Sequence, residues 1–230
     1  MKYVFIVLLF GFFTGCGPEQ SSSTSEEEPV SEKLSSGTLH ELEDRLLASE
    51  SVQVEFWITA EGAVTADLKG SLSLSTAQGV RMEGSGQFVG QDVDVNLLIN
   101  ENMLRGGSQT TTFDVEIPPA LNEGMLIGFT RMGLLHNLAR LTAGAPPDRT
   151  DGTVRDWVIV HNFSQTNENI DDLDALPLSF EIMVDSIPSG EVTLWIDEAT
   201  NLPIQRNQTV HFESGDMLVT ERYTKMSVEP

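Results

Sequence analysis

Residues 52–75 read VQVEFWITAEGAVTADLKGSLSLS, and apolar and polar side chains alternate along most of this stretch. In the first run Val52, Val54, Phe56 and Ile58 occupy every second position. Because successive side chains of a strand point to opposite faces, this spacing predicts strands with one buried and one wet face. Such strands are typical of an antiparallel sheet that is covered on one side only.

The same alternation continues through 80–88 and 93–99, so about four strands precede the middle of the chain. Turns between them are predicted at Glu61-Gly62, Gln78-Gly79 and Gly90. The second half of the chain predicts about five more strands, around 155–162, 177–184, 191–197, 203–212 and 216–228. Its hairpin turns are expected at 188–190 and 213–216, with a longer connection over 197–203.

A short helix is predicted to open the domain, in TLHELEDRLLASES. Thr38 has the position of an N-cap, and Glu41 follows at the spacing of a capping box. The apolar residues share one helical face, namely Leu39, Leu42, Leu46 and Leu47.

Residues 121–143, LNEGMLIGFTRMGLLHNLARLTA, interrupt the strands with a second helical pattern. Glu123, Thr130 and Asn137 form a narrow polar stripe, and apolar residues cover most of the remaining circumference. A surface helix has a narrower apolar stripe than this, so the segment is expected to lie between two apolar surfaces or to line a cavity. Gly128 and Gly133 also allow two short helices.

The predicted fold is therefore mainly β with a helical plug, in the α+β class. One strongly curved antiparallel sheet forms an unclosed half-barrel around the helices from the middle of the chain. Residues 38–230 contain no second low-complexity linker and have the size of a single domain with one core.

The N-terminal residues 1–15 have the features of a signal peptide, with Lys2 before an apolar run over 4–13. FFTGCG, residues 12–17, resembles the lipobox of bacterial lipoproteins, although Phe13 stands where that family usually has leucine. The resemblance implies that Cys16 becomes the first residue and carries fatty acids such as palmitate. An ordinary secretory signal with an incidental cysteine is the alternative.

Residues 16–37 are predicted to be the lipidated cysteine and a disordered tether, because serine, glutamate and proline dominate the stretch. Gly17 follows the cysteine, and in a lipoprotein of a Gram-negative host this implies sorting to the outer membrane. The expected location is the bacterial cell envelope, lipid-anchored and facing the periplasm.

The formal charge of −22 disfavours nucleic acid and anionic lipid surfaces as partners. The four histidines lack metal-ligand spacing, and NENIDDLD at 167–174 lacks the glycine turn of an EF-hand loop. A nucleophile elbow, a phosphate loop and a dinucleotide fingerprint are missing from the sequence. We therefore assign no catalytic residue, metal or cofactor and do not expect an enzyme.

The domain resembles the outer-membrane lipoprotein carrier and receptor family (LolA/LolB-like) and related lipid-carrier lipoproteins. The resemblance is carried by LHELEDRLLASESVQVEFW at 39–57, GSLSLSTAQGVRMEG at 70–84 and WIDEATNLPIQRNQTVHFESGDMLVTERYTKM at 195–226. It implies an unclosed antiparallel barrel with helices in an apolar cavity. Arg81 lies near the place of an arginine that holds the lid closed in the carrier branch, but its neighbours differ and the role is not assigned to it.

Three functions follow from this resemblance and from the apolar helix. The leading hypothesis is a membrane-tethered module that binds a lipid, an acyl chain or a lipoprotein, and the second is an envelope scaffold with a filled cavity. The third is a cryptic hydrolase. The candidate cavity-lining residues, which an ordinary core would explain equally well, are Phe56, Leu72, Met82, Phe88, Met125, Phe129, Met132 and Leu135.

The lipobox is tested by replacing its cysteine. Cys16→Ser removes the sulfur that would be acylated, so we expect either an unprocessed precursor or a soluble domain. Detergent-phase partitioning and the intact mass measure both outcomes. A variant that still enters the detergent phase with the mass of a lipidated chain contradicts the assignment.

Overall fold

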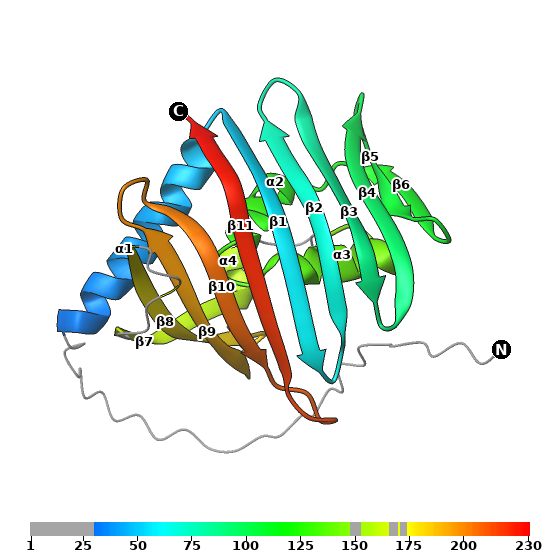
Figure 1. The fold of residues 1–230 in the computed structure, drawn as a ribbon. Helices are drawn as coiled ribbons and strands as arrows, with labels where there is room; N and C mark the ends of the chain where they lie inside the picture. The colour runs from blue at the N-terminus through cyan, green and yellow to red at the C-terminus, as the bar shows by residue number, and fades with distance from the viewer. Residues whose placement is uncertain (1–29, 148–152, 166–169, 171–173) are drawn as a thin grey trace, which may run out of the picture.

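The computed structural model describes residues 30–147, 153–165, 170 and 174–230 (Figure 1). The predicted signal peptide, Cys16 and residues 17–29 of the predicted tether lie outside this part of the chain. Most of the acidic stretch at 167–174 lies outside it as well.

One antiparallel sheet of eleven strands has the order β6-β5-β4-β3-β2-β1-β11-β10-β9-β8-β7. The strands are β1 Ser51–Gly62, β2 Ala66–Ser75, β3 Gly79–Phe88, β4 Gln91–Asn100, β5 Met103–Ser108, β6 Thr112–Glu116, β7 Val158–Gln165, β8 Ala175–Val184, β9 Ile187–Asp197, β10 Leu202–Val210 and β11 Met217–Glu229. The first and last strands pair along their whole lengths, from Ser51–Glu229 to Gly62–Met217. Because β6 and β7 lie at opposite edges, the sheet is unclosed, and the predicted fold class is confirmed.

In the part of the chain that the structure describes, four helices accompany the sheet, and they lie on the same side of it (Figure 1). They are α1 Val30–Ala48, α2 Leu121–Gly128, α3 Leu134–Thr142 and α4 Val154–Trp157. We call this side of the sheet the concave face. The alternation of the sequence explains it, because the apolar residues of β1 from Val52 to Ile58 are buried and the residues between them are exposed. Within the described residues, none of the helices has the length and hydropathy that a membrane crossing needs.

The N-terminal helix begins earlier than the sequence indicated. Because α1 starts at Val30, the last eight residues of the predicted tether are helical, and Thr38 lies inside the helix instead of capping it. Glu32, Lys33 and Leu34 favour helix, which explains the extension. The predicted apolar face is buried at Leu39, Leu42 and Leu46, whereas Leu47 is exposed.

Two further differences concern strands and turns. Strands β5 and β6 were not predicted, because Gly106 and Gly107 interrupt the alternation. The turn expected at 188–190 is wrong, since those residues belong to β9. The chain reverses instead at Asp185 and Ser186, whose φ values of 50° and 67° suit a tight hairpin. The turn at 213–216 is confirmed.

The segment 121–143 forms two helices, the alternative that its glycines allowed. Gly133 has φ +83° and ends the loop between them. Because of this break, Glu123, Thr130 and Asn137 do not form one polar stripe, and the last two are buried.

The Phe56 ring packs closely against Gly70, its partner on β2. A Cβ on Gly70 would lie 2.5 Å from Phe56 Cζ and would also collide with the carbonyl oxygen of Glu83. Gly70→Ala should therefore lower the free energy of unfolding by about 1–3 kcal/mol. Urea unfolding measures the change.

Gly37→Ala is the matched control, because a Cβ there meets nothing within 4 Å and the residue lies inside α1. It should leave the stability unchanged or raise it by up to about 1 kcal/mol. Equal effects of the two substitutions would contradict the packing of Phe56 on Gly70.

Candidate functional site

The eight predicted lining residues come together on the concave face. Six of the eight are buried members of the main apolar core, namely Phe56, Leu72, Met82, Met125, Phe129 and Leu135. Phe88 and Met132 are half-buried and pack against the same core. The structure therefore places all eight in one continuous apolar region, and contact with a ligand stays a prediction.

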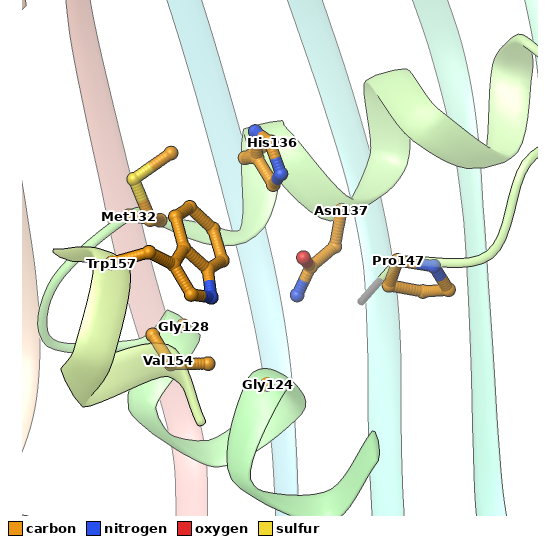
Figure 2. A pocket seen from close by; sticks show the side chains of 8 residues that line it. All are labelled: Gly124, Gly128, Met132, His136, Asn137, Pro147, Val154 and Trp157. Carbon is orange, nitrogen blue, oxygen red and sulfur yellow. The ribbon is translucent and has the colours of Figure 1, made fainter. Parts of the chain in front are cut away.

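The cavity among the helices is small. A cavity of about 10 Å³ lies among α2, α3 and α4 (Figure 2), and its lining consists of Gly124, Gly128, Met132, His136, Asn137, Pro147, Val154 and Trp157. That volume holds about one water molecule, whereas a site for a small ligand has on the order of 300–1,000 Å³. Met132 is the only predicted lining residue that borders it. This cavity is thus too small for such a ligand in this structure.

A larger hollow of about 570 Å³ lies near the β6 edge of the sheet, at Gly106 and Phe113. Its other residues are polar, and two of them, Arg105 and Asp114, form an exposed salt bridge of 2.8 Å. It shares no residue with the predicted lining set.

Residues 129–133, here called the insert loop, join α2 to α3 and carry most of the buried polar contacts. Glu43 of α1 is completely buried and accepts two bonds from Arg131, to Nε at 2.8 Å and to Nη2 at 3.0 Å. Thr130 Oγ1 donates to the same carboxylate at 2.9 Å, and Arg131 Nη1 donates to the carbonyl oxygen of Val158 at 2.6 Å. The insert loop is thereby bonded to α1 and to the edge strand β7.

On the side that faces the sheet, side chains of β10 and β11 bond to the backbone of the insert loop and of the first turn of α3. Arg206 donates to the carbonyl oxygens of Arg131, at 2.5 Å, and of Thr130, at 3.3 Å. Glu221 accepts hydrogen bonds from the first two backbone N–H groups of α3, at 3.0 Å and 2.8 Å. Because Arg206 and Glu221 lie opposite each other in the ladder, we call them the concave-face pair.

Tyr223 connects this pair to α2. Its hydroxyl donates to Glu221 Oε2 at 2.5 Å and lies 3.3 Å from the carbonyl oxygen of Phe129. Its ring meets the Phe129 ring edge to face, with centroids 5.4 Å apart.

Burial changes the protonation equilibria of these groups. It raises the pKa of Tyr223 well above its usual value, and the neighbouring charge of Glu221 acts in the same direction. The hydroxyl therefore stays protonated and remains a donor. Burial also lowers the pKa of Arg206, while the charge of Glu221 opposes that change. An arginine still keeps its proton, because its unperturbed pKa is above about 12.

The sequence analysis missed these polar residues, although their positions held a signal. Glu221 and Tyr223 fall on the same alternating face as Met217 and Val219. Glu43 lies on the buried face of α1 beside Leu39 and Leu46. A charged residue at a position that periodicity assigns to the core requires a buried partner.

The described residues contain no group of three or more histidine, cysteine, aspartate or glutamate side chains that could hold a metal ion. The buried polar groups around the insert loop are hydrogen-bond donors and acceptors that hold it in place.

No family model and no curated protein sequence matches the chain. Solved structures with a similar chain course exist at low identity. LprF from Mycobacterium bovis has a TM-score of 0.45 and 13% identity, over 84% of this chain and 93% of that one. The MucA/MucB complex of Pseudomonas aeruginosa has a TM-score of 0.40 and 16% identity, over 85% and 58%. A LolA superfamily protein from Nitrosomonas europaea has a TM-score of 0.33 and 11% identity, over 85% and 94%.

The buried contacts of Glu43 predict a large loss on its removal. Glu43→Ala leaves Arg131 without its bidentate partner, and this should lower the free energy of unfolding by about 3–5 kcal/mol. Replacing both residues together, as Glu43→Leu with Arg131→Met, removes both charges and should recover most of that loss. Urea unfolding of the three proteins measures it.

Glu83→Ala serves as the control, because it breaks the exposed pair with Arg81. It should cost less than about 1 kcal/mol. If the double variant is no more stable than Glu43→Ala, the loss does not arise from an uncompensated buried charge.

Proposed function

We propose that this chain is a cell-envelope lipoprotein whose half-barrel binds a lipid, an acyl chain or a lipoprotein after the α2–α3 segment moves away. The observation that carries the proposal is the way in which the insert loop is held. Arg131 of the loop bonds to Glu43 of α1, and Arg206 and Tyr223 of the sheet bond to the loop backbone. Glu221 bonds to the first N–H groups of α3, directly after the loop. Such contacts open and close together, unlike the continuous ladder of the sheet.

The apolar character of the segment supports the same proposal. Leu121, Met125, Ile127 and Phe129 are almost fully buried against the core, so their removal would expose a large apolar surface on both the helices and the sheet. Acyl chains are the ligands that such a surface would accept, because hydrophobic burial is proportional to apolar area.

The envelope location rests on the N-terminal motif. In this proposal Cys16 carries the lipid anchor, the residues that follow it lead to α1, and Gly17 directs the protein to the outer membrane. The domain then faces the periplasm, and its ligand moves between the half-barrel and a membrane without a chemical step.

An envelope scaffold with a permanently filled cavity is the second candidate. The observation in its favour is the cavity of only about 10 Å³ among the helices. In that case the polar contacts would fix the helices instead of releasing them.

Organic extraction of the gently purified full chain, followed by mass spectrometry, separates the two candidates. A stoichiometric lipid after expression in more than one host supports the carrier. Absence of any bound lipid, together with no uptake of a fluorescent fatty acid, supports the scaffold.

Tyr223→Phe tests whether the insert moves. The substitution keeps the ring contact with Phe129 but removes the hydroxyl that contacts Glu221 and the loop. We expect a loss of about 1–2 kcal/mol in the free energy of unfolding and severalfold faster uptake of a fluorescent fatty acid. Stopped-flow fluorescence measures the uptake.

Trp57→Phe is the control, because Trp57 is on the opposite face of the sheet and donates a comparable hydrogen bond to Asp67, at 2.8 Å. It should leave the uptake rate unchanged. Equal uptake rates for Tyr223→Phe and the wild type would show that the hydroxyl does not hold a lid.

A further inference from the structure

The concave-face pair has two properties that are not needed to hold the insert loop: one donor of Arg206 has no partner, and the two charged groups face one point. Arg206 is completely buried, yet within the described residues no acceptor lies in hydrogen-bond reach of its Nη1. A buried donor without a partner costs about 1–3 kcal/mol, more when it is charged. The closed structure therefore leaves part of the arginine unsatisfied.

The free Nη1 points to the place where the insert loop meets α3. A Cβ on Gly133 would lie 2.6 Å from Arg206 Nη1 and 2.6 Å from Glu221 Oε1. Both charged groups thus face one point, which the backbone of Gly133 crosses with φ +83°. A cationic and an anionic group converge there, at the start of a nine-residue helix.

The backbone groups at that point reveal what the pair recognises. Arg206 binds two carbonyl oxygens, and Glu221 binds two N–H donors. Acceptor atoms therefore lie on the arginine side and donor groups on the glutamate side. In the other charged pair near the loop, Glu43 with Arg131, the remaining donors and acceptors are taken by Thr130, Arg155 and Val158, so it offers no such arrangement.

We propose that Arg206 and Glu221 form a headgroup subsite for a phospholipid that carries both a phosphate and a primary ammonium, and that the insert loop occupies this subsite in the closed structure. A phosphate would accept from Nη1 and Nη2 together, which satisfies the donor that the loop leaves free. The ammonium would donate to Glu221 in place of the two N–H groups of α3. The inference rests on the proposed function, because a headgroup reaches the pair only when the insert has moved.

Other headgroups fit the pair less well. A purely anionic headgroup would bring its charge beside Glu221, and an uncharged diacylglycerol would leave Arg206 and Glu221 with only Gln208 and Tyr223 as polar partners. A quaternary ammonium carries the charge but has no N–H to donate. The remainder of the concave face is apolar, with Met217 and Val219 on the same strand as Glu221, and suits the acyl chains.

The test is a competition monitored by native mass spectrometry on the full chain in detergent. Equimolar phosphatidylethanolamine, its N-methylated forms, phosphatidylcholine, phosphatidylglycerol and diacylglycerol are offered with identical acyl chains. We expect phosphatidylethanolamine to exceed phosphatidylglycerol in the bound fraction about tenfold, as for a charge-assisted hydrogen-bonded contact. Binding should fall stepwise as methylation removes N–H donors.

Glu221→Gln keeps the size of the side chain and removes its charge. In a folded variant the ratio of phosphatidylethanolamine to phosphatidylglycerol should fall towards one, with diacylglycerol binding unchanged. Glu55→Gln, on the opposite face of the sheet, is the control and should keep the wild-type ratio. If Glu221→Gln does not fold, the methylation series on the wild type still decides the question.

The outcomes that overturn the proposal differ from those that overturn the function. Equal binding of all headgroups, or a preference that survives Glu221→Gln in a folded protein, removes the headgroup subsite and leaves lipid binding in place. A wild-type chain that binds none of the lipids removes both.

Discussion

The backbone of the insert loop can cross the buried side of the sheet only because side chains take up its hydrogen bonds. A buried backbone group that lacks a hydrogen bond costs about 1–3 kcal/mol. Residues 129–135 contain several N–H and C=O groups that need side-chain partners. Arg206 and Glu221 of the sheet satisfy four of them, and Arg131 is neutralised by Glu43. These few bonds add to the apolar packing that holds α2 and α3 in the half-barrel.

The residues that hold the loop come from both ends of the chain. Glu43 belongs to α1, the first described element, whereas Glu221 and Tyr223 belong to the last strand. Pairing of β1 with β11 in the middle of the sheet brings the two ends together. The insert loop in the middle of the chain is therefore held by elements from both ends of the chain. In a lipoprotein anchored at Cys16, the helix that follows the tether would also be one of the supports of the loop.

The sequence predicted the sheet well, because period-two alternation in β1 to β4 reports directly which side is buried. It predicted the helical plug from an apolar surface too wide for one sheet face. It failed where local patterns are weak, at β5 with its paired glycines and at Thr38, whose capping role is overridden by the residues before it. Periodicity could have marked Glu221 as a charge on the buried face, but its pairing with Arg206 depends on a strand register that only the folded chain defines.

The same polar groups that close the half-barrel also decide what would open it. A ligand that offers only hydrocarbon replaces the apolar contacts of α2 and α3, but it leaves Arg206 and Glu221 facing an apolar phase, where uncompensated charges are costly. A ligand with its own acceptor and donors at the right place compensates both losses together. Selectivity in this half-barrel would then arise from two buried charges on the sheet, and the apolar wall around them would supply affinity without discrimination.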